Sequence, residues 1–489
     1  MTERLRNDPL ITGILKPKIK VDPKVEAFER LKEFLKTSWT PSVDYIMGES
    51  RNYSLYVNDQ RAIPFVGDGF KHVQRVALWA MRNRAEKIKV VALGGSLAES
   101  GLYVHGDVSC NAAISRLAAP YLNNNCLLDG DGHFGSRLAP LDGIGAPRYV
   151  SVKRSKLAEE LLYTDLACVP LEDNYDGSNK QPKHFLPLIP IVLLNGISGM
   201  GVGYSTDILP HKLTDIIDAT ICALKGKPIK ELLPHWEKYN LTIDSLGEGK
   251  YELWGQVEKL DTSRARITEI PPGLEVEELR KRLIEMEDTD EIVSFTDRST
   301  KNINIEVKFK RGTIADWDEK KLLRFFKLNE KLTERLVVRS WNNLSITRIE
   351  TPEELVRQFV EWRLGWYVNR YEHLLAKTND ELTYWLLVQA MISSGFMRKL
   401  GKFPNKAAVE TEVRAVADKS KIDSTDYHID RAISLPTYRW TLEFEAEVSD
   451  KIAELRKDIA EYEDILAKPE RRKSIYVGEV EALKKLKMK

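Results

Sequence analysis

A heptad repeat near the C-terminus constrains the fold most strongly. Apolar residues recur there in alternating steps of four and three, the pattern of a coiled-coil seam. They are Val448, Ile452, Leu455, Ile459, Tyr462 and Leu466, and Pro469 follows them. A second long helix is predicted to start at Thr351, an N-cap followed by proline and, three residues on, by glutamate. We expect an antiparallel coiled-coil arm with a small helical tip; two amphipathic core helices are the alternative.

The composition fits a multidomain protein without a global excess of basic charge. The chain has 489 residues and a mass of 56.0 kDa, which at about 150 residues per domain suggests roughly three domains. Its 74 Lys and Arg balance 73 Asp and Glu, so a polyanion site needs local clustering of basic residues. Four cysteines lie apart without a CxxC pair, which indicates a reducing cytoplasmic compartment and argues against a zinc finger.

Absent motifs narrow the function. The N-terminus lacks the apolar core of a signal peptide, and prolines interrupt the longest apolar stretch, 185–203, so no membrane partner is expected. There is no P-loop and no HExxH motif, and Tyr204 stands where a dinucleotide-binding GxGxxG needs its last glycine. The two DxD triplets are as many as chance predicts, so we expect no metal site in this chain. ATP hydrolysis, if it is needed, must occur on another chain.

Residues 69–156 predict a mixed α/β unit with a basic surface. Helices are expected over 69–85 and 107–122, followed by the glycine-rich stretch 127–136 and an alternating strand at 149–153. This order is typical of a winged helix-turn-helix. Basic residues cluster on the first helix and around the wing. Either cluster alone fits an ordinary solvated surface, but together they indicate a groove for a phosphate backbone.

Four segments resemble the DNA-cleavage subunit of type IIA DNA topoisomerases. Residues 63–75 (IPFVGDGFKHVQR) resemble the segment that opens the DNA-gate domain, and 103–107 (YVHGD) are similar to its HxHGD turn. Residues 129–136 (DGDGHFGS) and 146–149 (APRY) resemble the DGxGNFGS loop and the catalytic Arg-Tyr pair. Residues 184–211 resemble the entry into the tower domain. The matches are collinear, and weaker similarity extends over most of the chain.

Within this family the chain looks most like the medium (A-type) subunit of T-even-type bacteriophages. Gln74, Val76 and Tyr103 stand where bacterial enzymes have His, Arg and His, so the retention of every phosphate-binding role stays open. No pinwheel domain with a basic glycine-rich box follows the second long helix, so gyrase-type supercoiling is not expected. In the phage branch, ATPase and metal-binding parts lie on separate chains.

The resemblance implies a mixed α/β, multidomain fold: a winged-helix DNA gate, an α/β tower, and an antiparallel coiled coil with a helical C-gate. Tower strands are expected at 265–270 and 303–309. The predicted domains are an N-terminal arm and helix (1–50), the DNA gate (51–160), the tower (161–345), the first coiled-coil helix (346–392), the C-gate tip (393–440), and the second coiled-coil helix with a tail (441–489).

Tyr149 and Arg148 are the predicted catalytic residues. A tyrosine that attacks a phosphodiester keeps the bond energy in a phosphotyrosyl diester, so religation needs no cofactor. A free phenol is a weak nucleophile near neutral pH, and the adjacent Arg148 supplies a guanidinium that matches phosphate oxygens. Neighbours on a strand point to opposite faces, so a loop or bulge at Pro147 is required. Without the resemblance of the surrounding segments, Arg148 and Tyr149 would be interpreted as two ordinary surface residues.

Four more residues are predicted near the scissile phosphate. By resemblance, Arg61, Lys71 and His105 bind or polarise it, and Arg61 and Lys71 are cations without an obvious partner in the chain. His105 lies in a predicted tight turn, so a structural role is an equal alternative. Arg75 either contacts backbone phosphates or caps its helix, and the sequence does not decide between the two.

Met200, between two glycines, is the predicted DNA wedge. An apolar side chain exposed on a glycine-rich turn can insert between base pairs and bend the duplex. The family has a wedge residue here, usually isoleucine. A buried core methionine is the alternative.

The resemblance also implies the partners. The substrate is double-stranded DNA, and two copies pair through the DNA gate and the C-gate, because a double-strand break needs one Tyr149 on each strand. Mg²⁺ and ATP are bound mainly by partner subunits that carry the ATPase and the metal ligands.

The expected location is on DNA in the cytoplasm of an infected host cell. The alternatives are a non-cleaving winged-helix DNA-binding protein, a tyrosine recombinase and a nuclease.

Overall fold

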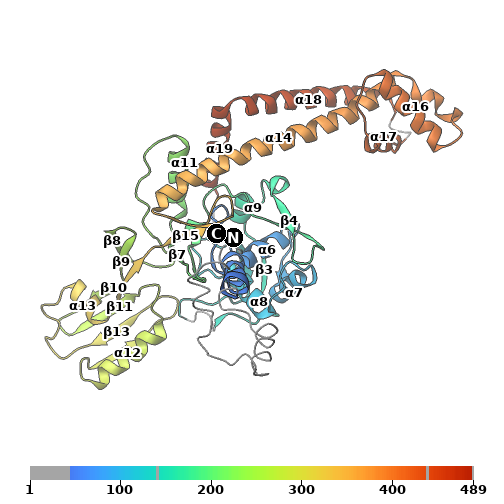
Figure 1. The fold of residues 1–489 in the computed structure, drawn as a ribbon. Helices are drawn as coiled ribbons and strands as arrows, with labels where there is room; N and C mark the ends of the chain where they lie inside the picture. Colours follow the sequence, from blue (N-terminus) through green and yellow to red (C-terminus); the bar gives the residue numbers. More distant parts are fainter. Residues whose placement is uncertain (1–44, 139–142, 437–439, 487–489) are drawn as a thin grey trace, which may run out of the picture. The chain divides into compact units, whose positions relative to one another are not determined.

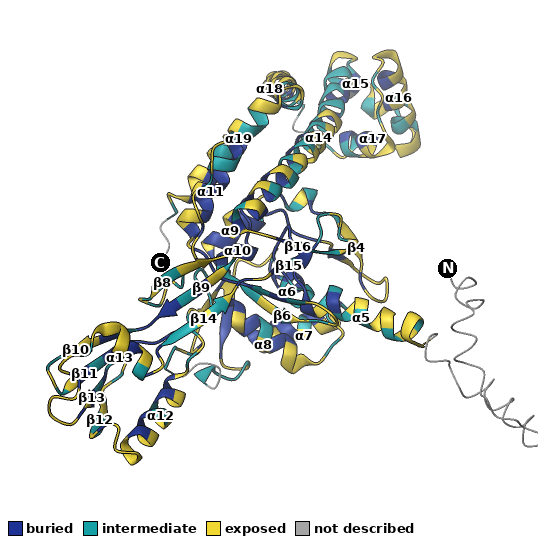
Figure 2. Cartoon of the chain, turned by 60° about the vertical axis from the view of Figure 1, so that its left-hand side comes forward, coloured by how far each residue is buried: buried dark blue, intermediate teal, exposed yellow. Residues whose placement is uncertain are grey.

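A computed structural model describes residues 45–138, 143–436 and 440–486 (Figure 1). The chain divides into two compact units, Met1–Asn58 and Asp59–Lys489. In the first unit the described residues form η1 (Ile46–Ser50) and α5 (Arg51–Val57), neither of which buries a side chain (Figure 2). Of the predicted N-terminal arm and helix (1–50), residues 1–44 lie outside the described residues.

Three helices and a small antiparallel sheet form the first part of the second unit. The helices are α6 (His72–Ala80), α7 (Val90–Glu99) and α8 (Asp107–Leu117). The sheet has the order β1-β3-β2 and consists of β1 (Ile88–Lys89), β2 (Leu128–Asp131) and β3 (Ser151–Arg154). The two predicted helices and the ribbon are confirmed. The helix α7 forms in an apolar stretch for which the sequence predicted no element.

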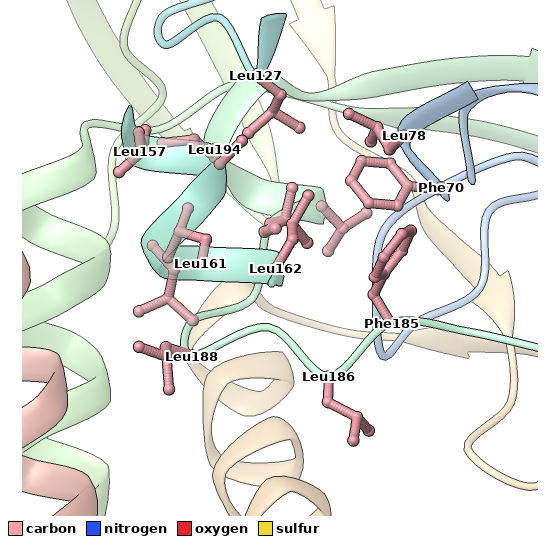
Figure 3. Packing of buried hydrophobic residues seen from close by; sticks show 14 of the residues in the cluster. Phe70, Leu78, Leu127, Leu157, Leu161, Leu162, Phe185, Leu186, Leu188 and Leu194 are labelled. Carbon is pink, nitrogen blue, oxygen red and sulfur yellow. The ribbon is translucent and has the colours of Figure 1, made fainter. Parts of the chain in front are cut away.

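The first hydrophobic core continues through elements further along the chain. They are α9 (Lys156–Leu162), η4 (Leu166–Cys168), α10 (Val192–Asn195), β6 (Ile197–Met200), β7 (Ser205–Ile208), α11 (Leu213–Leu224), β15 (Leu336–Arg339) and β16 (Ile346–Ile349). The chain also forms η2 (Asn58–Ala62) before α6, and β4 (Leu171–Asp173) and β5 (Lys180–Pro182) between η4 and α10. The strands pair as antiparallel hairpins, β4-β5, β6-β7 and β15-β16. Figure 3 shows leucines of α9 beside Phe185, Leu188 and Leu194 in this core.

A second hydrophobic core lies between residues 254 and 328. Its four-stranded antiparallel sheet has the order β10-β11-β13-β12. The strands are β10 (Gln256–Lys259), β11 (Arg264–Glu269), β12 (Ser294–Asp297) and β13 (Ile305–Lys308), and the helices are α12 (Val276–Asp288) and α13 (Glu319–Phe325). A three-stranded sheet of order β14-β9-β8 adjoins it, from β8 (Thr242–Gly247), β9 (Lys250–Trp254) and β14 (Asn329–Thr333). Both predicted strands are confirmed, as β11 and β13.

The helix α14 (Pro352–Ser393) joins the first core to a third. Its N-cap is as predicted, because the Thr351 hydroxyl accepts the backbone N–H of Glu354 at 3.2 Å. Leu355 and Phe359 belong to the first core, whereas Leu387 belongs to the third. The third core also contains residues of α15 (Phe396–Lys399), η5 (Leu400–Lys402), α16 (Lys406–Lys419), α17 (Asp426–Ile433) and α18 (Leu442–Ala467).

The helix α18 runs back along α14 (Figure 1). Val448, Ile452 and Leu455 of the heptad repeat are buried, so the repeat is the contact face. The helix ends before Pro469 as predicted. A correction concerns the tail: Pro469 opens a further helix, α19 (Pro469–Leu483), whose Tyr476 packs in the first core. Proline suits the first position of a helix, so one residue ends one helix and begins the next.

A buried ion pair holds the loop before α6. Arg75 Nε and Nη2 donate to the Asp68 carboxylate at 2.6 and 3.0 Å. The same carboxylate accepts the backbone N–H groups of Phe70 and Phe185 at 3.1 and 3.0 Å. The exposed fractions of the two charged side chains are 4% and 0%. The pair therefore ties the start of α6 to a distant segment of the first core.

The buried carboxyl group of Glu334 lies between β14 and β15. Glu334 Oε1 accepts the backbone N–H of Leu209 at 3.0 Å. The pKa of Glu334 is raised to about 8, mainly by burial and also by the nearby Glu353 and Asp207, against the lowering effect of the Leu209 hydrogen bond. Its ordinary pKa is 4.5, so at neutral pH the folded chain holds a proton that the unfolded chain has lost.

Replacing Arg75 by methionine is predicted to destabilise the chain strongly. The change leaves the Asp68 carboxylate buried without its cation, which costs about 3–5 kcal/mol. Lys180→Met is the matched control, because Lys180 pairs with Asp173 at the surface, where such pairs contribute about 0–1 kcal/mol. Thermal unfolding of the two variants measures the difference. Equal unfolding temperatures would contradict the importance of the buried pair.

The Glu334 carboxyl is predicted to make the stability fall as the pH rises. Between about pH 4.5 and 8 only the folded chain holds this proton, so the free energy of unfolding drops by about 1.4 kcal/mol per pH unit. Glu334→Gln is expected to remove this slope and to unfold at a higher temperature than wild type near pH 8. Glu248→Gln, at an exposed side chain, serves as control. The same pH slope in all three proteins would show that Glu334 is not the responsible group.

Candidate functional site

Tyr149 lies on a turn directly before β3. The turn spans residues 147–149, so the predicted interruption of the strand at Pro147 is confirmed. The Tyr149 side chain is 66% exposed, and the Arg148 guanidinium carbon lies 4.7 Å from the centroid of its ring. Lys89 Nζ donates to the backbone carbonyl of Tyr149 at 2.8 Å. The turn therefore brings a phenol and a guanidinium together at the surface.

The N-terminus of α7 holds this turn in place. The backbone N–H of Val91 donates to the carbonyl of Pro147 at 3.2 Å, and that of Val90 donates to the carbonyl of Val150 at 3.1 Å. The first N–H groups of a helix have no partner within it, so the turn satisfies two of them. Val150 itself is buried in the first core. One residue after the exposed phenol, the chain is thus anchored.

Arg61 and His105 meet near the start of α8. Arg61 Nη2 lies 2.9 Å from His105 Nδ1. A guanidinium only donates, so Nδ1 accepts and the ring proton sits on Nε2. Burial and then Arg61 lower the pKa of His105, which keeps the ring neutral at pH 7. The Tyr103 ring stands edge-on to the imidazole, with centroids 5.3 Å apart.

Lys71, at the N-cap of α6, is half-buried and bonded within the chain. Its Nζ donates to the backbone carbonyl of Ser198 in β6 at 2.7 Å. Burial lowers the pKa of Lys71, and Arg116 lowers it further. The expectation that Lys71 and Arg61 have no partner in the chain is wrong, because Lys71 contacts β6 and Arg61 contacts His105.

Arg75 does not belong to the site. The sequence left a phosphate contact and a helix cap open, and the structure contradicts both. The guanidinium points into the core, where it donates to Asp68 and to the carbonyl of Phe70. Only 3% of the residue is exposed, so it cannot reach a DNA backbone in this structure.

Met200 is the last residue of β6, at the tip of the β6-β7 hairpin. It is 90% exposed, so the alternative of a buried core methionine is wrong. It pairs with Ser205, and the next residue, Gly201, donates its N–H to the carbonyl of Tyr204 at 2.8 Å. Val202 and Tyr204 are 50% and 48% exposed, so the tip of the hairpin is apolar.

The two basic clusters predicted from the sequence are partly neutralised. Lys87 forms an exposed ion pair with Asp131. Arg137 pairs with Glu269, and both side chains are mostly buried. The exposed cations beside the turn are Arg148 and Lys89. Ion pairs within the chain thus remove part of the basic surface that the sequence predicted.

The described residues hold neither a metal-ligand cluster nor a membrane-spanning helix. No group of three or more His, Cys, Asp or Glu side chains that could hold a metal ion occurs among residues 45–138, 143–436 and 440–486. No described helix combines the length and the apolar character needed to cross a membrane.

Comparisons with known proteins identify relatives of the chain. A family profile for the A-type subunit of DNA gyrase/topoisomerase IV matches residues 61–481. The DNA topoisomerase medium subunit of Enterobacteria phage T4 is 28% identical over 428 residues, which cover 85% of this chain and 93% of the phage protein. DNA topoisomerase 2-alpha of Gallus gallus is 30% identical over 371 residues, or 69% of this chain. The aligned part of this chain spans only 23% of the chicken protein.

A solved structure has a similar fold. It is the DNA-binding, cleavage and re-ligation domain of Plasmodium falciparum topoisomerase II, with a TM-score of 0.78 and 24% sequence identity. The similarity covers 94% of this chain and 68% of that chain. Together with the family profile, which matches most of the sequence, these relatives show that the chain belongs to the type IIA topoisomerases, in the family of A-type DNA-cleavage subunits.

Proposed function

We propose that this chain cleaves and rejoins DNA as one subunit of an ATP-dependent type II topoisomerase. Tyr149 is the nucleophile, and Arg148 stabilises the transition state. One observation carries the proposal: the turn at 147–149 exposes the phenol and holds a guanidinium 4.7 Å from its ring. A tyrosine with only a packing role would not need to be two-thirds exposed beside an unburied arginine.

The proposed reaction is a transesterification. Tyr149 loses its phenolic proton to water, and its oxygen forms a bond to phosphorus while the bond between phosphorus and the 3′ oxygen breaks. The protein is then linked to a 5′ phosphate, and the 3′ end takes up a proton as a hydroxyl. Religation reverses both changes, and one phosphodiester replaces another throughout. A guanidinium stays charged at neutral pH and donates two parallel bonds to phosphate oxygens, which suits Arg148 to the growing charge.

Arg61, Lys71 and His105 are proposed to hold the scissile phosphate. The contact between Arg61 and His105 supports a shared site, since it fixes a neutral imidazole beside a cation. Met200 is proposed to be the wedge that bends the duplex. Its exposure at the tip of a paired hairpin supports this role, because insertion between base pairs needs an apolar side chain on a rigid mount.

The finer architecture is part of the same proposal. Residues 51–160 form the winged-helix DNA gate, and 161–345 form the tower. The helix pair of α14 and α18 is the coiled coil, and 393–440 form the C-gate tip. Two copies pair through both gates, so that each DNA strand meets one Tyr149 and a second duplex can pass, which gives relaxation and decatenation.

Mg²⁺ and ATP are proposed to be bound mainly by partner subunits. The phage T4 relative is named a medium subunit, which supports an enzyme built from several chains. Magnesium would neutralise charge on the phosphate oxygens. The described residues of this chain do not fit a magnesium site, because no suitable group of ligands gathers among them.

Tyr149→Phe tests the proposed nucleophile. In the complete enzyme with Mg²⁺, denaturation of the reaction leaves protein covalently attached to labelled DNA. The variant is expected to lose this adduct by a factor on the order of 10³ or more while it still binds DNA. Tyr175→Phe, at a tyrosine that is 87% exposed, is the control and should form the adduct normally. An adduct that persists in Tyr149→Phe would contradict the proposal. If the wild-type enzyme forms no adduct, the chain is a non-cleaving DNA-binding protein.

Met200→Ala tests the wedge. Unstacking two base pairs costs a few kcal/mol, and contacts of the inserted side chain offset this cost. Without the side chain, we expect the DNA to bend less and the cleavage sites to change. Energy transfer between dyes at the two ends of a duplex measures the bend. Ile284→Ala, at an exposed residue of α12, is the matched control. Unchanged bending together with unchanged cleavage sites would remove Met200 from the mechanism.

A further inference from the structure

The strand that carries Met200 rests on the segment that carries Arg61 and Lys71. Lys71 Nζ and the Ser198 carbonyl are 2.7 Å apart, although 127 residues separate them in the chain. A Cβ atom on Gly199 would lie 2.0 Å from the carbonyl oxygen of Ala62 and 3.1 Å from Lys71 Nζ. Only glycine allows this approach, so β6 packs directly against the backbone beside Arg61.

The hairpin is short, and each residue of β6 pairs with a residue of β7. β6 pairs with β7 from Ile197 opposite Ile208 to Met200 opposite Ser205. Met200 lies two residues beyond Ser198, which is roughly 7 Å along a strand. A displacement of the tip when Met200 inserts between base pairs would therefore reach the contact with Lys71 through one paired strand.

We propose that Lys71, through its contact with β6, couples DNA bending by Met200 to its own binding of the scissile phosphate. The inference rests on the proposed function. An ammonium group has three N–H donors, so Lys71 can keep its bond to Ser198 and donate to a phosphate oxygen at the same time. Insertion of Met200 sets the position of β6, and β6 sets the positions of the Lys71 ammonium and the backbone next to Arg61. The phosphate is held for attack only when the duplex is bent.

Lys89 supplies a matched control for the experiment. Its ammonium group also donates to a backbone carbonyl, that of Tyr149, at 2.8 Å. This bond joins Lys89 to the turn rather than to β6. Lys89→Met thus removes a similar ammonium–carbonyl bond near the site without releasing the strand that carries Met200.

A double-mutant cycle with Lys71→Met and Met200→Ala tests the coupling. The full chain is assembled with its partner subunits, and the cleavage rate is measured with Mg²⁺. The bend is measured separately in a Tyr149→Phe background, so it does not depend on cleavage. Lys71→Met is expected to reduce both the bend and cleavage. The double variant should lose less cleavage than the product of the two single losses, by about fivefold or more. The pair of Lys89→Met and Met200→Ala is expected to lose the full product.

Three results would overturn the coupling. They are a wild-type bend in Lys71→Met, single losses that multiply in the double variant, and wild-type bending and cleavage in Gly199→Ala. The last variant forces β6 away from Ala62, and its unfolding temperature shows whether it folds. If the proposed function itself is wrong, neither the wild type nor any variant forms a covalent adduct. The measured bend in Lys71→Met would then still test whether Lys71 affects DNA bending.

Discussion

The amide groups at the start of α7 determine where Tyr149 can be. Helix N-termini present backbone N–H groups without partners inside the helix, and here two of them bind carbonyls of the 147–150 segment. The chain therefore exposes the phenol on the turn and then passes through the buried Val150 into β3. The same end of a helix carries a partial positive charge, which suits a place where a phosphate is expected to bind. A phenol on a loop without these two hydrogen bonds would not be held in one position.

Buried charges anchor the long helices to the first core. Arg363 and Arg370 of α14 both pair with Asp165, and Arg370 also donates to Glu479 of α19 at 2.7 Å. Removing one partner from such a network leaves an uncompensated buried charge, which is strongly destabilising. The base of the helix pair is thus fixed to the core that holds the Tyr149 turn. These ion pairs involve residues near the first core; among the described residues, none of them reaches the third core at the other end of α14.

Local signals in the sequence predicted much of this structure. The N-cap at Thr351, the heptad repeat and the interruption at Pro147 depend on residues close together in the chain, and all three are confirmed. Glycine lowers helix propensity, so Gly94 and Gly95 obscure the helix α7 in the sequence. In the structure, the backbone at Gly94 lies close to the Asn111 side chain of α8. Tertiary packing, which periodicity does not reveal, overrode the local preference.

The errors at the candidate site have the same origin. A charged residue is taken as exposed unless a partner is known, so Arg75 was placed at the surface although Asp68 holds it in the core. The partner of Lys71 lies 127 residues away, beyond the reach of any pattern in a single sequence. The sequence also did not show whether the side chain of Met200 is buried or exposed. The β6-β7 hairpin exposes it to solvent.

Identification of the residue bound to DNA tests the central claim most directly. The covalent complex would be trapped with denaturant, digested with nuclease and protease, and the nucleotide-bearing peptide sequenced by mass spectrometry. The account predicts a single modified position, the phenolic oxygen of Tyr149, joined to a 5′ phosphate. A nucleotide attached to any other side chain, or to the 3′ end of the broken strand, would contradict it.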